Sequence, residues 1–261
     1  MDRPLKGCTV LVTRPAEQAQ ALIGEIEKCG GQVVFAPMIA IQPRHGNQQA
    51  VDAIKQLNDY DIVIFISKNA VEHGMQMIKA AKQSIAQHAV YAVGVGTGSR
   101  LHELGAIDVH TPKGEFSSEG LLKMPGLSAH EIEGKKVLII RGAGGRELLA
   151  QSLQHRGATV DYCEVYERVV PAARLTDVLL ACKVTTPDIA LITSPEALTN
   201  LAEKIDQEGL DMMYDVPLMV AGERTAHEAE RLGFTMEPIL VDSPGDHCIV
   251  EALILWANNE Q

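Results

Sequence analysis

Polar side chains follow several apolar runs of this sequence, at the point where each run ends. Hydroxyl or cationic groups in that position are candidates for ligand contacts, and they are Thr13, Arg14, Ser67, Lys68, Thr97, Arg141, Ser194 and Thr225. The loop RGAGGRE at 141–147 adds Arg146. The planar arginine fork suits carboxylates, and helix N-termini attract anions. The pattern therefore predicts a site for a ligand that carries several carboxylates.

A simpler interpretation is open for each of these residues. Ser67 and Ser194 are good helix N-caps, and Pro195 strengthens the second. Thr97 and Thr225 are also compatible with capping, and the loop glycines with a tight turn. The sequence completes neither GxGxxG nor GxxxxGK[ST], which argues against a dinucleotide or triphosphate. It shows no nucleophile–base pair, so any chemistry should depend on positioning and proton transfer.

Tyr166 lies in the stretch CEVYERVV, 163–170, where an extended run among charged residues meets a change in chain direction. A buried tyrosine needs a partner for its hydroxyl group. Either the phenol bonds a backbone carbonyl in the core, or it faces a ligand. The residue alone leaves both interpretations open.

Composition restricts the class of protein. The chain has 261 residues, 46% of them hydrophobic, and a net charge of -11, which argues against a nucleic-acid surface. No apolar run is long enough to span a bilayer, and the first residues do not resemble a signal peptide. Five scattered cysteines indicate a reduced, cytoplasmic protein. The histidines and cysteines lack metal-site spacing, so we expect no metal.

The sequence contains an internal repeat. VLVTRP at 10–15 matches VLIIRG at 137–142, and DIVIFISKNAV at 61–71 matches DIALITSPEAL at 188–198, each 127 positions later. With a shift of one residue, YAVGVGTGSRLHELG at 91–105 matches MVAGERTAHEAERLG at 219–233. Apolar strands alternate with amphipathic helices in both halves. The sequence thus predicts two doubly wound, parallel α/β domains that arose by duplication.

Periodicity leaves the division of the chain open. The halves fold either as contiguous domains or with exchanged pieces. In the exchanged arrangement, 1–38 and 169–261 form one discontinuous domain, and 40–167 form the other. The crossings then fall near 39–43 and 166–171, two extended segments that each reach a proline. These segments could pair as a two-stranded antiparallel linker that includes Tyr166.

The ordered set of motifs resembles the uroporphyrinogen-III synthase family over essentially the whole chain. The motifs are VLVTRP, ISKNAV, AVGVGT, EVYE, TSPEAL, MVAGERTA and SSEGLL. The resemblance implies the exchanged domain arrangement and a lyase of tetrapyrrole biosynthesis that needs no cofactor. Its substrate would be hydroxymethylbilane. Loss of the terminal hydroxyl as water and inversion of ring D on closure would give uroporphyrinogen III, a precursor of haem and sirohaem.

The resemblance also implies roles for individual residues. Tyr166 matches the family tyrosine that assists loss of the hydroxyl, directly or through water. The strand-end hydroxyls and cations named above would bind the acetate and propionate groups. We expect a monomer with a transient contact to the preceding enzyme of the pathway. The alternative is a non-enzymatic, two-domain protein that captures a small anion in the manner of a sensor, since fold alone does not give function.

Overall fold

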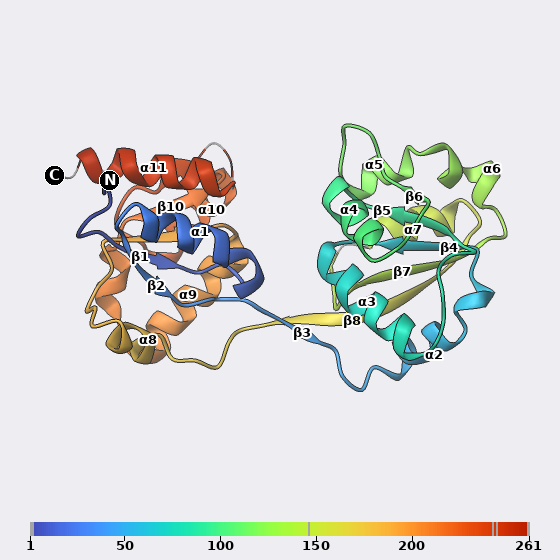
Figure 1. Ribbon diagram of the computed structural model, residues 1–261, viewed down its shortest axis with the longest axis horizontal. Coiled ribbons are helices and arrows are strands. Elements are labelled where there is room, and N and C mark those ends of the chain that lie inside the picture. The colour runs from blue at the N-terminus through green and yellow to red at the C-terminus, as the bar shows by residue number, and fades with distance from the viewer. Residues whose placement is uncertain (1–2, 146, 242, 244, 260–261) are drawn as a thin grey trace. The chain divides into compact units, whose positions relative to one another are not determined.

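The computed structural model describes residues 3–145, 147–241, 243 and 245–259. The chain divides into two compact units (Figure 1), which are described separately below. Unit 1 consists of Met1–Ala40 and Val169–Gln261, and unit 2 of Ile41–Arg168. The chain thus leaves unit 1 after Ala40 and re-enters it at Val169. In the described part of the chain, no helix has the length and apolarity that crossing a membrane requires.

Unit 1 contains a five-stranded parallel sheet in the order β11-β10-β9-β1-β2. Its strands are β1 (Thr9–Val12), β2 (Gln32–Phe35), β9 (Ile189–Ile192), β10 (Leu218–Ala221) and β11 (Ile239–Val241). Its helices are α1 (Ala16–Lys28), α8 (Leu175–Ala181), α9 (Pro195–Glu208), α10 (Glu223–Leu232), α11 (Asp246–Asn259) and the short 3-10 helix η3 (Asp211–Asp215).

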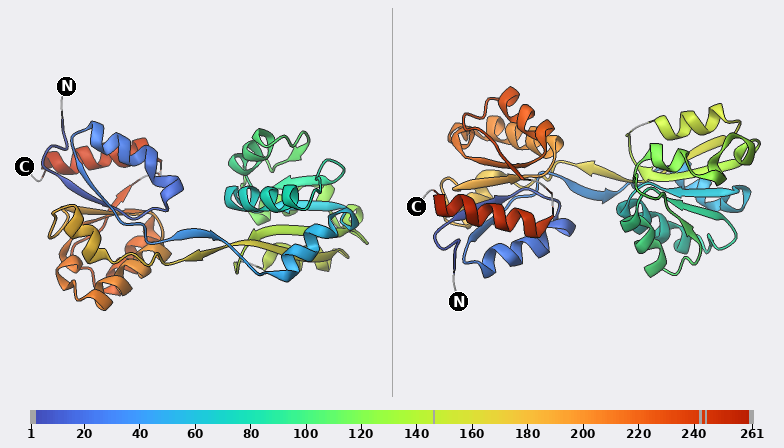
Figure 2. Two further views of the ribbon diagram at one scale, coloured as in Figure 1. Left: turned by 60° about the horizontal axis from the view of Figure 1, so that its bottom comes forward. Right: turned by 90° about the horizontal axis from the view of Figure 1, so that it is seen from above.

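Helices cover both faces of the unit 1 sheet. Ala19, Leu22 and Ile26 recur at helical spacing along α1, and they pack with Leu253 of α11 against the strands. Figures 1 and 2 show α8 and α9 on the opposite face of this sheet. The central strands β9 and β10 are apolar throughout because both faces of the sheet are covered there.

Unit 2 contains a six-stranded sheet in the order β3-β8-β7-β4-β5-β6. Its strands are β3 (Ala40–Pro43), β4 (Ile62–Phe65), β5 (Ala89–Ala92), β6 (Val109–His110), β7 (Lys136–Gly142) and β8 (Thr159–Val169). Its helices are α2 (Gln48–Lys55), α3 (Lys68–Ala80), α4 (Val95–Glu103), α5 (Ser118–Leu122), α6 (Ala129–Ile132) and α7 (Leu148–His155), with 3-10 helices η1 (Leu57–Asp59) and η2 (Pro125–Leu127).

Strand β4 shows why the unit 2 sheet is apolar on both sides. Val63 and Phe65 belong to one buried cluster, and the alternating residues Ile62 and Ile64 belong to another. Successive side chains of a strand point to opposite faces, so each face of the sheet has its own core. The α/β class with parallel sheets, predicted from the sequence, is confirmed.

The two sheets have corresponding strand orders, as expected for a duplicated fold. Strands β1, β2, β9, β10 and β11 of unit 1 match β7, β8, β4, β5 and β6 of unit 2. Gly30 and Gly157, which are paired in the sequence repeat, both have a φ of 91°. The first strand of the chain therefore completes the sheet of the second repeat.

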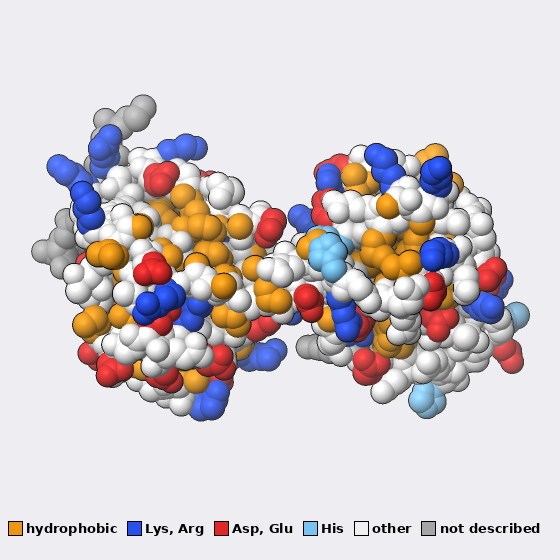
Figure 3. All heavy atoms as spheres, turned by 90° about the horizontal axis from the view of Figure 1, so that it is seen from below, with side chains coloured by type: hydrophobic (Ala, Val, Ile, Leu, Met, Phe, Trp, Pro, Cys, Tyr) orange, Lys and Arg blue, Asp and Glu red, His pale blue; other side chains and the backbone are white. Residues whose placement is uncertain are grey.

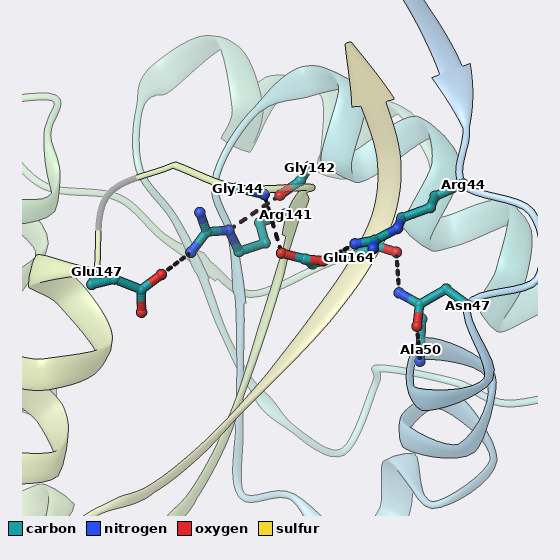
Figure 4. Close-up of polar contacts among 8 residues, drawn as sticks. All are labelled: Arg44, Asn47, Ala50, Arg141, Gly142, Gly144, Glu147 and Glu164. Atoms are coloured by element: carbon teal, nitrogen blue, oxygen red, sulfur yellow. Dashed lines mark hydrogen bonds and ion pairs between the residues drawn. The ribbon is translucent and has the colours of Figure 1, made fainter. Parts of the chain in front are cut away.

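Hydrogen bonds and an ion pair join the segment that enters unit 2 to β8. Strand β3 lies beside β8 at the edge of the sheet (Figures 1 and 2). The amide of Arg44 donates to the carbonyl of Val165 at 3.1 Å, and its guanidinium pairs with Glu164. Asn47 caps α2 and donates to the carbonyl of Glu164 at 2.9 Å. Figure 4 shows the contacts of Arg44 and Asn47 with Glu164.

Candidate active site

Each unit has a point where the chain leaves two neighbouring strands in opposite directions. In unit 2, β4 leads to β5 on one side, whereas β7, on the other side of β4, leads to β8. In unit 1, β9 leads to β10 and β1 leads to β2. Ligands of open α/β sheets bind at such switch points. Ser67 follows β4, Ser194 follows β9, and Thr13 and Arg14 follow β1.

The hydroxyl groups of Tyr166 and Ser67 meet at the switch point of unit 2. Their oxygens, Oη and Oγ, are 3.1 Å apart. Ser67 is also the N-cap of α3, since its Oγ accepts a hydrogen bond of 3.1 Å from the amide of Ala70. That acceptor role leaves the serine hydrogen free for donation to Tyr166. In this arrangement the phenolic hydrogen is available to a ligand.

Tyr166 lies inside strand β8, and its orientation depends on a β-bulge. Arg141 of β7 pairs with Glu164, but the next residue, Gly142, pairs with Tyr166, so Val165 is the extra residue. A bulge re-aims the side chains that follow it. A Cβ on Gly142 would lie only 2.6 Å from two ring carbons of Tyr166. Glycine at 142 therefore makes room for the phenol.

The Tyr166 ring is buried, with 5% of its surface exposed. The ring of His73, in the second turn of α3, lies against it with a centroid separation of 5.8 Å. Helix α3 thus supplies both the hydroxyl partner of Tyr166, through Ser67, and a neighbour for its ring.

Arg141 is a buried cation beside the phenol, with 6% of its surface exposed. Its guanidinium carbon lies 4.6 Å from the ring centre of Tyr162, and its Nη1 lies 3.6 Å from Oε1 of Glu147. Its Nε donates to the carbonyl of Gly142 at 3.2 Å, as Figure 4 shows. Tyr162 donates to Glu147 at 2.7 Å, and burial and this carboxylate raise the pKa of Tyr162 to about 12.

A pocket of about 210 Å³ joins these groups. It lies at the unit 2 switch point, because its walls come from the ends of β4 and β7 and from β8. Its polar lining residues are Ser118, Arg141, Tyr162, Tyr166 and Arg168. Of the residues predicted from the sequence, this pocket gathers Arg141 and Tyr166, and Ser67 contacts Tyr166 beside it.

Sequence reasoning missed three of the pocket residues, Ser118, Tyr162 and Arg168. Arg168 follows Tyr166 by two positions, so strand alternation places both on one face of β8 and could have identified it. Ser118 is the second serine of SSEGLL, one of the motifs that carry the family resemblance. For Tyr162 the sequence holds no comparable signal, because its stacking on Arg141 depends on pairing between β7 and β8.

Lys68 and Thr97 lie at the first turns of α3 and α4. Lys68 is exposed, and its side chain passes over the start of α4, where a Cβ on Gly96 would lie 2.8 Å from its Cε. Thr97 is buried inside the first turn of α4. The N-cap of this helix is Gly94, so Thr97 is not a capping residue. The structure does not bring either residue into the pocket that contains Tyr166.

In unit 1 the predicted residues are bonded within their own unit. The hydroxyl of Thr13 donates to the carbonyl of Leu191 in β9 at 2.7 Å. Arg14 pairs with Asp246, at the start of α11, at 2.5 Å. Ser194 caps α9 by accepting from Ala197, with Pro195 in the first turn.

Thr225 is buried in the first turn of α10, where its hydroxyl donates to the carbonyl of Ala221 at 3.4 Å. The N-cap of α10 is Gly222, so the capping interpretation is wrong for Thr225 as well. Arg146, predicted from the loop after β7, lies outside the described residues.

The charges of the molecule are mixed locally despite the net charge of -11. On the face of each unit drawn in Figure 3, acidic and basic side chains are interspersed. Arg141 and Arg168 add two cations to one pocket of unit 2. Among the described residues, no cluster of three His, Cys, Asp or Glu side chains could hold a metal ion.

Fold and site together define a doubly wound α/β protein in two units, with a polar pocket at a switch point beside a buried tyrosine. Comparison with known proteins identifies the family. The family model of uroporphyrinogen-III synthase HemD matches residues 20–239. The chain therefore belongs to the uroporphyrinogen-III synthase family, as the sequence predicted, and membership indicates a lyase-type enzyme of porphyrin biosynthesis.

Individual relatives agree with this assignment. The uroporphyrinogen-III synthase of Salmonella typhimurium is 28% identical over 247 residues, which cover 94% of this chain and 99% of the relative. That of Proteus mirabilis is 33% identical over 162 residues, 62% of this chain and 80% of the relative. The comparisons give no support to the alternative of a non-enzymatic anion-binding protein.

Solved structures show the same fold. A crystal structure of mutant uroporphyrinogen III synthase from Thermus thermophilus has a TM-score of 0.63 at 20% identity, covering 98% of this chain and 100% of that one. A structure of the Helicobacter pylori synthetase has a TM-score of 0.60 at 16% identity, covering 95% and 99%. At these identities the likeness supports the fold alone.

Proposed function

We propose that this protein converts hydroxymethylbilane, a linear tetrapyrrole, into uroporphyrinogen III with inversion of ring D. The observation that carries the proposal is the Tyr166–Ser67 hydroxyl pair beside a polar pocket, in a chain of this family. The terminal C–O bond of the bilane breaks when a pyrrole nitrogen lone pair expels the hydroxyl. That group leaves as water once its oxygen has gained a proton, and an azafulvenium cation is left behind.

Tyr166 is the proposed source of that proton, directly or through one water. Ser67 accepts from the Ala70 amide, and once Tyr166 has lost its proton the serine hydroxyl can only donate to the phenolate, whose negative charge this hydrogen bond stabilises. The N-terminus of α3 adds a favourable dipole at the same place. The remaining steps, spiro attack, reopening and closure, need the chain held in one conformation, which is a task of positioning.

The carboxylates of the bilane are the proposed ligands of the cations and helix N-termini. Arg141 and Arg168 line the pocket beside Tyr166 and are placed to bind one carboxylate there. Further contacts are proposed for the other residues predicted from the sequence, which are Thr13, Arg14, Ser67, Lys68, Thr97, Arg146, Ser194 and Thr225. The Thr13 and Thr225 hydroxyls donate to backbone carbonyls. We therefore propose that the adjacent backbone amides, and not these hydroxyls, donate hydrogen bonds to the substrate.

The protein is proposed to act as a monomer in the cytoplasm. Its substrate cyclises unaided to the non-inverted isomer, which favours a transient contact with the enzyme that makes the bilane. Analytical ultracentrifugation of the protein at micromolar concentration tests the first point. A stable dimer would contradict it.

The activity is tested by isomer analysis. Hydroxymethylbilane is generated in situ, the protein is added, and the oxidised porphyrins are separated chromatographically into types I and III. We expect predominantly type III product. Type I alone, formed at the rate seen without protein, would overturn the proposed function.

A further inference from the structure

A second cavity, of about 910 Å³, lies in unit 2 away from the switch point. The site residues follow the carboxyl ends of the strands. This cavity lies at the other end of the sheet, at the amino ends of β5 and β6. Its walls come from α3 between Glu72 and Lys79, the segment 82–88 and the turn 104–108. Its volume is in the range of sites for small molecules. The proposed reaction uses none of its lining residues.

Unit 1, the other copy of the repeat, shows which side chains occupy the corresponding place in its own structure. The same backbone hydrogen bonds occur in both units, joining Ile85 to His88 and Met213 to Val216, and Leu101 to Ala106 and Ala229 to Phe234. This register makes Ala86 the counterpart of Tyr214, and Ala106 the counterpart of Phe234. Both alanines line the cavity.

The counterpart residues in unit 1 form an aromatic pair. The rings of Tyr214 and Phe234 have centroids 5.0 Å apart, and Phe234 is buried. In unit 2 two methyl groups, those of Ala86 and Ala106, replace these two rings. The space that the duplicate fills with aromatic side chains is thus left open in unit 2, and an aromatic ligand would restore the packing.

His88 in the wall of the cavity is the second observation that bears on the ligand. It lines the cavity at a position where the duplicate has the core residue Val216, and 9% of it is exposed. Its Nε2 lies 3.0 Å from the carbonyl of Leu57, an acceptor, so Nε2 carries the proton of the neutral ring. Nδ1 is then a buried acceptor, and it has no partner among the described residues. A buried acceptor without a donor costs free energy.

The charged side chains at the rim of the cavity favour a ligand with an acid group. Lys79 and Lys82 line the cavity, and neither forms an ion pair within the part of the chain that the structure describes. Of the two acidic lining residues, Glu72 is already paired with Arg100. Two lysines therefore face a single uncompensated carboxylate, that of Asp108.

We propose that this cavity binds a small, planar aromatic acid that carries a hydrogen-bond donor. Its ring occupies the volume that Tyr214 and Phe234 fill in unit 1, next to Ala86 and Ala106. Its acid group lies near Lys79 and Lys82, and its donor bonds Nδ1 of His88 after a turn of the imidazole ring brings that buried atom to the cavity.

Calorimetric titration with three probes tests the ligand class. Indole-3-acetate has the ring, the acid and an N–H donor. Naphthalene-1-acetate lacks the donor, and tryptamine has a cation in place of the acid. We expect saturable binding in the order indole-3-acetate, naphthalene-1-acetate, tryptamine, with about tenfold between the first and last. No saturable heat with millimolar indole-3-acetate, or tighter binding of tryptamine, would overturn the proposal.

A filled variant tests the location of the site. Ala86→Tyr combined with Ala106→Phe installs the side chains of the duplicate, and we expect at least tenfold weaker binding of indole-3-acetate with no loss in Tm. Unchanged affinity in this folded variant would refute the site.

Two milder variants decide the matter if the filled variant does not fold. Lys79→Gln with Lys82→Gln changes exposed residues, and it should weaken indole-3-acetate about fivefold while leaving tryptamine unaffected. His88→Val should abolish the preference for indole-3-acetate over naphthalene-1-acetate. Equal affinities of the wild type and both variants for all three probes would contradict the proposal.

Discussion

Gly142 and Tyr166 face each other across β7 and β8, and the phenol ring fills the space where a side chain at 142 would lie. A Cβ there would be 2.6 Å from the ring carbons Cε2 and Cζ and 3.0 Å from Oη. The position of the proposed proton donor thus depends on a residue that has no side chain of its own.

Gly142→Ala should therefore displace the ring of Tyr166 and separate it from Ser67. Overpacking of this kind costs about 1–3 kcal/mol of stability, and we expect kcat to fall at least tenfold. Gly24→Ala in α1 is the matched control, because its Cβ would meet nothing within 4 Å. Steady-state kinetics and thermal unfolding measure both effects. Full activity in Gly142→Ala would show that the ring position does not matter.

Ser67→Ala removes both the cap of α3 and the partner of the phenol. Loss of an N-cap costs about 1 kcal/mol, and Ser194→Ala in unit 1 should cost a similar amount because it removes the equivalent cap of α9. Only Ser67→Ala removes a hydrogen bond to Tyr166, so it should lower kcat about tenfold, a larger effect than the rise in KM from a lost substrate contact. If KM rises and kcat does not change, Ser67 binds substrate and does not support the donor.

Arg141→Gln should weaken substrate binding more than it slows turnover. The guanidinium is buried in the pocket, and its loss removes a charge-assisted contact to a carboxylate. We expect KM to rise about tenfold, with a smaller dependence of KM on salt than in the wild type. Arg231→Gln, on the exposed side of α10, removes a surface ion pair with Glu228 and should change neither quantity.

The lowered pKa of Glu208 predicts that the stability of the protein depends on pH. Burial alone would raise its pKa, but hydrogen bonds from Thr176 and Leu175 and the charge of Arg174 outweigh burial and lower it. These bonds, 2.7–2.8 Å long, tie the end of α9 to the start of α8. A lowered folded-state pKa gives stability that is present above the unfolded-state pKa of about 4.3 and lost as pH falls through the folded value.

Glu208→Gln should therefore reduce Tm by a few degrees at pH 7, because the charged acceptor is lost. The difference from the wild type should shrink below about pH 4, where the wild-type carboxyl also becomes protonated. Calorimetric scans at a series of pH values measure it. A constant difference down to the lowest pH would show that the charge of Glu208 does not contribute.

The repeat explains why much of this molecule could be predicted from the sequence. Apolar strands flanked by helices predict parallel sheets, and duplicated positions such as Ser67 and Ser194 keep the same capping role in both units. Their place after a strand follows from periodicity alone. That Ser67 also contacts Tyr166 does not, since residue 166 reaches it only through the bulge at Val165.

Other contacts depend on side-chain geometry that sequence spacing does not encode. Thr13 has the residue type of a ligand contact, yet its hydroxyl donates to a neighbouring strand. Thr97 and Thr225 have the residue type of a cap, but glycines occupy the cap positions before them. The cavity beside Ala86 could not be predicted from the sequence pattern either. It results from the small size of two residues, whereas the backbone register of the two repeats is the same.

The central claim is that the Tyr166 hydroxyl promotes departure of the bilane hydroxyl, and Tyr166→Phe tests it most directly. This variant keeps the ring, so the packing against Gly142 and His73 is preserved. Tyr214→Phe removes a phenol that bonds Asp206 on unit 1 and is the matched control. The measurement is the rate of type III porphyrin formation from hydroxymethylbilane. We predict a loss of about 100-fold or more for Tyr166→Phe and wild-type rates for Tyr214→Phe. A wild-type rate in Tyr166→Phe would contradict the account.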